Sequence, residues 1–232
     1  MEEMIKALNA ESESERCFAA QDLGYENQSE CLDPLIDRLK IEKSRMVREA
    51  IVVALGKLNR GPVVEAVVRL FENEDPFLRN AAISILKSKG VEAVPALLER
   101  LEHQDPDIRK FSLDTLTVID ADLSNAIYGK ALEDPDVNVR ITAVEYVGLH
   151  RKFQFKTAVE KALFNSKSTM LSSVCLQTLL VIGDEISYHL VLNQYPKEKS
   201  VPAALKDLWW RFIGLHFKER FKNRSSGEAH AV

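Results

Sequence analysis

Apolar residues recur along this chain at helical spacing, always in register with an arginine. When Arg79 is numbered zero, apolar or small residues fall at −1, +3 and +7, namely Leu78, Ala82 and Leu86. Positions three to four apart share one face of an α-helix, so this segment predicts a helix with one buried stripe. A second stretch, residues 94–101, has the same spacing. Sustained strand alternation with hairpin turns is not found, and the predicted fold class is all-α.

The same pattern returns about every 31 residues. A fixed period of this length indicates one structural unit stacked on itself. We expect about seven helical hairpins, at residues 2–24, 30–59, 61–89, 91–119, 122–150, 154–183 and 185–222, stacked into a right-handed superhelix. In the sixth unit Cys175 takes the place of the arginine. The repeated arginines are Arg16, Arg48, Arg79, Arg109 and Arg140.

Turn chemistry separates the two apolar stretches of each unit. Asp75 and Asp105 are natural N-caps, and each is followed by a proline at the first helical position, where the missing amide donor does no harm. Asp136 repeats this signal in a slightly lengthened form. Glycines near the other ends of these stretches predict C-terminal stops: Gly24, Gly56, Gly90, Gly148 and Gly183.

The string D-P-x-(V/I/L)-R-x-x-A-x-x-x-L-G, repeated over residues 12–183, resembles the HEAT repeat. It is most similar to the short bacterial HEAT-like repeats named after phycobilisome lyases. The resemblance implies that the aspartates cap the second helix of a hairpin and that the arginines form a polar ladder between neighbouring repeats. The ladder would comprise Arg16, Arg48, Arg79, Arg109 and Arg140, with Asp75, Asp105 and Asp136 as partners. Cys175 interrupts it.

We expect one HEAT-like domain over residues 1–232. Regular repeats would occupy residues 12–183, a cap would follow over residues 184–222, and a disordered tail over residues 223–232. The adjacent Trp209 and Trp210 would place one indole in the core of the cap and leave the other partly exposed.

A partner surface is expected on the arginine-bearing helices, opposite the buried stripe, where such helices line the concave face. Positions +1, +2 and +5 face that way. Several hold apolar residues at sites that should contact solvent, which is typical of an interaction surface. The expected partner-binding residues are Phe18, Val53, Phe111, Asp114, Ile141, Glu145, Leu176 and Leu180. The alternative is that Phe18 and Phe111 are buried against neighbouring repeats.

Composition narrows the functional classes. A net charge of −4 disfavours nucleic-acid binding, which needs clustered basic residues, although residues 200–232 carry a local excess of Lys and Arg. No apolar run approaches the roughly 20 residues of a membrane span, and no secretory signal opens the chain, which favours a cytoplasmic location. Three cysteines without CxxC spacing are expected to be reduced thiols.

Sequence signatures of catalysis are lacking. No HExxH, GxGxxG, GxxxxGK[ST] or GxSxG motif occurs, and no histidine is followed by glutamate. We therefore expect no metal, no cofactor and no catalytic residue, and interpret Cys175 as a packing residue. The leading hypothesis is a non-enzymatic scaffold that binds another protein. The family resemblance leaves one alternative, a bilin lyase-type or chromophore-handling accessory subunit acting on antenna proteins.

Overall fold

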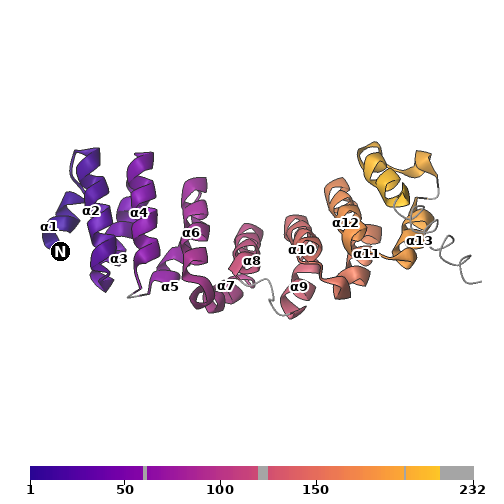
Figure 1. The fold of residues 1–232 in the computed structure, drawn as a ribbon, viewed down its shortest axis with the longest axis horizontal. Helices are drawn as coiled ribbons and strands as arrows, with labels where there is room; N and C mark the ends of the chain where they lie inside the picture. Colours follow the sequence, from indigo (N-terminus) through magenta and orange to yellow (C-terminus); the bar gives the residue numbers. More distant parts are fainter. Residues whose placement is uncertain (60–61, 120–124, 196, 215–232) are drawn as a thin grey trace, which may run out of the picture. The chain divides into compact units, whose positions relative to one another are not determined.

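The computed structural model describes residues 1–59, 62–119, 125–195 and 197–214. All regular secondary structure in these ranges is helical, as Figure 1 shows. The predicted all-α fold of stacked helical hairpins is confirmed. The contacts divide the chain into two compact units, residues 1–122 and 123–232, each of which has its own core.

Unit 1 stacks four helical hairpins. Its short helices are α1 (Glu2–Ala7), α3 (Leu32–Ile41), α5 (Val63–Val68) and α7 (Val94–Arg100). The arginine-bearing helices are α2 (Glu13–Glu26), α4 (Arg45–Lys57), α6 (Pro76–Lys89) and α8 (Pro106–Ile119). Each arginine-bearing helix packs against the next one along the chain (Figure 1). Short 3-10 segments lie at Ser29–Cys31, Arg69–Glu72 and Gly90–Ala93.

Unit 2 continues the pattern with α9 (Asn125–Leu132), α10 (Val137–Leu149), α11 (Lys156–Asn165), α12 (Thr169–Ile182) and α13 (Glu185–Gln194). Here α10 packs against α12, and α9 contacts both α10 and α11. Residues 206–214 are also helical. Further 3-10 segments are Phe153–Phe155, Glu198–Ser200 and Ala203–Leu205.

The predicted N-caps are present. The Oδ1 atom of Asp75 accepts a hydrogen bond from the amide of Phe77 at 2.8 Å, and that of Asp136 accepts one from Asn138 at 2.8 Å. Asp105 accepts from the amide of Asp107 at 2.9 Å. These bonds satisfy amides at the first turn that have no partner within the helix, so they fix where each arginine-bearing helix begins.

Several glycines have a different role from the predicted one. Gly24 and Gly148 are buried inside α2 and α10, where they permit close helix packing rather than end the helix. Only Gly90 among the described glycines has a positive φ, 58°. The left-handed residue that ends α2 is Asn27, with φ 51°. Asparagine tolerates this conformation better than most residues, so the stop signal was present but was misassigned to Gly24.

The predicted terminal cap is described only as far as residue 214. Trp209 is buried, while Trp210 is exposed and packs edge-on against it, with ring centroids 4.9 Å apart. Trp209 therefore contributes to the core of unit 2. The expected tail, residues 223–232, and the end of the expected cap lie outside the described residues.

Lys89, the last residue of α6, forms an inter-repeat contact that the sequence does not reveal. Its Nζ donates to the carbonyl oxygen of Gly56 at 2.8 Å and to that of Leu58, both at the end of α4. Burial lowers the pKa of this amine. Carbonyls in the last turn of a helix have no partner within the helix, so Lys89 ties the end of one repeat to the next.

We expect Lys89→Met to lower the free energy of unfolding by about 2 kcal/mol, because two carbonyls lose their donor while the apolar stem is retained. Urea unfolding followed by circular dichroism measures this change. Lys87→Met is the matched control, since Lys87 lies in the same last turn of α6 but is exposed. Equal effects of the two substitutions would show that the buried hydrogen bonds of Lys89 do not stabilise the stack.

Candidate functional site

A groove runs between α2 and α4 on the surface of unit 1. Its volume is about 380 Å³. Because α2 and α4 are consecutive arginine-bearing helices, equivalent positions of two repeats face each other across it. The lining residues are Ser14, Cys17, Phe18 and Gln21 from α2, and Met46, Glu49, Ala50 and Val53 from α4.

Three large apolar side chains on this groove are more than half exposed. The exposed fractions are 65% for Phe18, 52% for Met46 and 56% for Val53. The sequence pattern predicted Phe18 and Val53 as surface residues of this kind. It missed Met46, which lies two positions before Arg48 and outside the three wheel positions considered. An apolar cluster around a concavity is typical of an interaction surface.

The two helices that form the groove differ in charge. Glu13, Glu15, Asp22 and Glu26 are exposed on α2, whereas its single cation, Arg16, is half-buried. On α4, Glu49 forms an ion pair with Arg45 at 2.8 Å, so the two charges largely compensate each other. The surface therefore combines apolar side chains with a net negative helix along one side.

Two further predicted residues, Phe111 and Asp114, lie on α8 of the same unit. The Phe111 ring is half-buried and packs against the buried Phe71, with ring centroids 5.8 Å apart. The guanidinium of Arg79 lies 5.6 Å from the same ring centroid. Asp114 forms an ion pair with Lys110 at 3.3 Å. Phe111 therefore packs against a neighbouring repeat, as the alternative interpretation of the sequence predicted.

In unit 2, a shallower groove of about 410 Å³ separates α10 from α12. Glu145 lines it, together with the exposed apolar residues Leu149 and Val181. Of the other predicted residues, Ile141 and Leu180 are half-buried. Leu176 is 0% exposed, so it belongs to the core and offers no surface to a partner. The prediction placed Leu176 at +1 by setting Cys175 at the arginine position. In the structure Ser172 occupies that position, four residues after the N-cap Ser168, so Leu176 lies at +4, on the buried side of α12.

The repeated arginines form hydrogen bonds within their own repeats. The Nη1 atom donates to the carbonyls five and six residues earlier at four of the five positions: Ala10 and Glu11 for Arg16, Asn73 and Glu74 for Arg79, His103 and Gln104 for Arg109, and Asp134 and Pro135 for Arg140. Arg48 reaches the carbonyl of Glu42 through Nε. Each arginine side chain is thus hydrogen-bonded to the backbone of the loop that precedes its helix.

Two of the ladder arginines, Arg16 and Arg48, contact a carboxylate of the next repeat. Arg48 Nη2 lies 2.9 Å from Asp75 Oδ2, as the ladder predicted. At the preceding junction, Arg16 pairs with Glu42, which the sequence analysis did not single out, at 2.8 and 3.2 Å. Glu42 lies two residues before the N-cap Ser44. Because it is neither an aspartate nor an N-cap residue, the repeat pattern does not identify it.

Glu42 is buried and accepts hydrogen bonds from two arginines and two backbone amides. It is 2% exposed and accepts hydrogen bonds from Arg38 as well as Arg16, and from the amides of Lys43 and Ser44 at 2.9 and 2.8 Å. Burial by itself raises the pKa of this carboxyl. The hydrogen bonds from Arg16, Ser44, Arg38 and Lys43 outweigh burial and hold the pKa at about 2. Glu42 is therefore ionised in the folded protein at neutral pH.

The described residues show little that favours catalysis. Burial raises the pKa of the Cys175 thiol to about 12, with Arg140 opposing this, so Cys175 is protonated at neutral pH and poorly nucleophilic. Within the described ranges, His, Cys, Asp and Glu side chains do not gather in a group of three or more able to hold a metal ion. Membrane-spanning candidates are likewise missing there, since the helices are too short or too polar.

The family comparison agrees with the repeat architecture of the first part of the chain. Residues 1–87 match the family of HEAT repeats. Among solved structures, a chain of the complex of CpcE and CpcF of phycocyanin lyase from Nostoc sp. PCC7120 is 24% identical, with 92% of each chain covered and a TM-score of 0.39. The Escherichia coli protein YibA is 16% identical, with 85% of this chain and 76% of that one covered and a TM-score of 0.48.

A designed armadillo repeat protein in complex with the peptide (KR)4 is 15% identical to this chain. The match covers 78% of this chain and 98% of the designed one, with a TM-score of 0.39. The search of curated proteins found no match.

Proposed function

We propose that this chain, whose residues 1–87 are HEAT repeats, is a non-enzymatic scaffold that binds a partner protein through the groove between α2 and α4. The observation that carries the proposal is the exposure of Phe18, Met46 and Val53 around one concavity. Covering each of these side chains would contribute on the order of 1–2 kcal/mol of favourable transfer free energy. The repeats supply a rigid frame for them.

The groove suits an amphipathic helix with basic residues beside its apolar face. An inserted helix would place apolar side chains between Phe18 on α2 and Val53 on α4. Its basic residues would then lie beside the acidic residues of α2, such as Asp22 and Glu26. Charge complementarity of this kind raises association rates and selects among partners more than it raises affinity. Partner binding should therefore weaken with salt, but only in part.

We expect Phe18→Glu to weaken partner binding at least about tenfold, because it removes an apolar contact and places a carboxylate inside the groove. Affinity capture from native lysate with mass spectrometry would identify proteins retained by the wild-type chain, and titration of the purified partner would give the affinity. Phe111 is a poor position for this test, since its ring packs against Phe71.

The matched control is Ile41→Glu. Ile41 is 66% exposed, lies at the end of α3 in the same unit, and does not line the groove. Binding by this variant should equal that of the wild type, and both variants should retain the wild-type melting temperature. If Phe18→Glu and Ile41→Glu bind the partner equally well, the groove is not the docking site and the proposal fails.

The bilin-handling alternative remains a prediction of the family resemblance. The described residues offer no geometry that argues for it in particular. A visible absorption spectrum of the protein mixed with a linear tetrapyrrole would separate it from the scaffold proposal, because a chromophore held in a site shifts its absorption band.

A further inference from the structure

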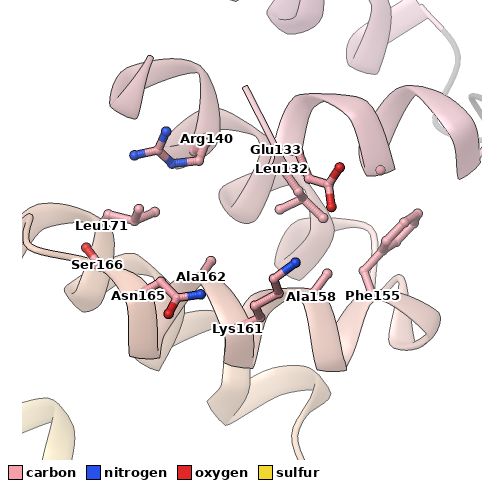
Figure 2. Close-up of a pocket in the computed structure, with 11 residues that line it drawn as sticks. Leu132, Glu133, Arg140, Phe155, Ala158, Lys161, Ala162, Asn165, Ser166 and Leu171 are labelled. Atoms are coloured by element: carbon pink, nitrogen blue, oxygen red, sulfur yellow. The ribbon is translucent and has the colours of Figure 1, made fainter. Parts of the chain in front are cut away.

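Unit 2 also contains a cavity, distinct from the groove between α10 and α12, that is lined by cations and by an apolar wall. It has a volume of about 330 Å³ and lies between α9 and α11, where α10 and α12 also contribute side chains. Figure 2 shows Arg140 and Leu171 at one end and Phe155 at the other. Between them, Lys161 projects from α11 toward α9. The wall between the two ends consists mainly of Leu132, Ala158 and Ala162.

Arg140 differs from the first two ladder arginines in what it meets at the next repeat. Arg48 pairs with Asp75, the N-cap of the following arginine-bearing helix, and Arg16 pairs with Glu42, two residues before the following N-cap. At the junction after Arg140 both equivalent positions are serines, namely Ser168 as the N-cap and Ser166 two residues earlier. A serine hydroxyl carries no charge, so the protein itself supplies no carboxylate at either position.

The hydrogen bonds of Arg140 in the described structure use one nitrogen. Its Nη1 donates to the carbonyls of Asp134 and Pro135, at 2.6 and 3.0 Å. At the two earlier junctions, Arg16 uses Nε and Nη2 for a carboxylate, and Arg48 uses Nη2. The corresponding nitrogens of Arg140 have no carboxylate within ion-pair distance among the described residues. Arg79 also has none, but its guanidinium lies over the Phe111 ring, whereas Arg140 borders a cavity.

We propose that this cavity binds a carboxylate of a partner polypeptide, presented beside an apolar side chain. The carboxylate would take the place at Arg140 that Asp75 takes at Arg48, near the side chains of Asn165 and Ser166. The apolar group would lie along the wall toward Phe155, and Lys161 would add a second cation. Glu133, which also lines the cavity, disfavours a ligand with charge along its whole length. A ligand with one carboxylate, placed at the Arg140 end, would meet the positive charge of Arg140 without bringing a second negative charge near Glu133.

The carboxylate could be a chain terminus or an acidic side chain, and small probes separate the two. N-acetyl-leucine carries a terminal carboxylate beside an apolar group, and N-acetyl-leucine amide is the same molecule without the charge. The third probe is N-acetyl-leucyl-glutamate α-amide, whose only carboxylate is on the glutamate side chain. Binding to the full chain is followed by the NMR shifts of the Arg140 Nε–H and of the backbone amides of α11.

We expect saturable shifts with at least one carboxylate probe and none with N-acetyl-leucine amide. Saturation by N-acetyl-leucine alone would identify a chain terminus as the ligand, and saturation by the glutamate probe alone an acidic side chain. Ser168→Asp should lower the affinity for the carboxylate probe at least about tenfold, because the new aspartate supplies the carboxylate that Arg140 lacks.

Ser168→Asn is the matched control, since asparagine caps a helix about as well as aspartate but carries no charge. It should bind the probe as the wild type does. Lys161→Gln, at an exposed position, should also weaken binding without changing the melting temperature. The proposal is overturned if no carboxylate probe gives saturable shifts in the wild-type chain, or if Ser168→Asp and Lys161→Gln both bind it with wild-type affinity.

Discussion

Replacing Glu42 with glutamine should destabilise the protein more than any other single change considered, by about 3–5 kcal/mol. The substitution keeps the shape of the side chain but removes the negative charge that Arg16 and Arg38 share. Both guanidiniums would remain partly buried without a counter-ion. The cost of an uncompensated charge in such a site exceeds the modest value of an exposed ion pair. Urea unfolding at pH 7, followed by circular dichroism, measures the loss.

The same carboxylate makes stability depend on pH in a defined window. The pKa of Glu42 is about 2 in the folded chain, against an ordinary value of 4.5. A lowered pKa means that its contribution is complete above pH 4.5 and is lost as pH falls from 4.5 toward 2. A difference of this size corresponds to roughly 3 kcal/mol. The wild type and Glu42→Gln should therefore converge in stability as the pH approaches 2.

Glu49→Gln is the control for both measurements. Glu49 also pairs with an arginine at 2.8 Å, but Arg45 and Glu49 are both exposed. We expect this substitution to cost less than about 1 kcal/mol at pH 7. Two results would contradict the role assigned to Glu42. One is a loss of stability for Glu42→Gln as small as that for Glu49→Gln. The other is a difference in unfolding free energy between wild type and Glu42→Gln that stays the same at low pH.

Gly24→Ala should lower the free energy of unfolding by about 3 kcal/mol, at the upper end of the usual cost of overpacking. A Cβ atom at position 24 would lie 2.8 Å from the Cα and 2.9 Å from the Cβ of Ala54. The nearer atom belongs to the backbone of α4, so no side-chain rotation relieves the contact and the two helices must separate. Thermal and urea unfolding of the variant would measure this effect.

Gly129→Ala provides the comparison, because it makes the same chemical change inside another helix. There the nearest atom to an added Cβ is 3.9 Å away, on the Phe155 ring, which is ordinary contact. Alanine favours the helix by up to about 1 kcal/mol over glycine, so this variant should be unchanged or slightly more stable. Equal behaviour of the two variants would mean that α2 and α4 are not held at close approach. Since these helices form the groove, Gly24→Ala should also reduce partner binding.

The helical wheel predicted the exposure of some residues of the candidate site correctly and of others wrongly. The wheel placed Phe18 and Val53 correctly on an exposed surface, because positions +3 and +7 of both helices, such as Ile51 and Leu23, are buried on the other side. It failed for Leu176, which is buried, because the sequence register put Cys175 in place of the arginine. In the structure Ser172 lies four residues after the N-cap of α12 and takes that place. For Phe111 the wheel left two alternatives, an exposed position or burial against a neighbouring repeat, and the contact with Phe71, 40 positions earlier, supports the second.

The sequence by itself determined the all-α class, the repeat length and the starts of the capped helices. Those features depend on interactions within about one helical turn, such as Asp75 with the amide of Phe77, and on a period that repeats along the chain. Tertiary structure alone decided that Gly24 is a packing position, that Lys89 links α6 to the end of α4, and that Glu42 pairs with Arg16 of the preceding repeat. These roles depend on contacts between residues about 30 positions apart, whose distances the local pattern does not contain.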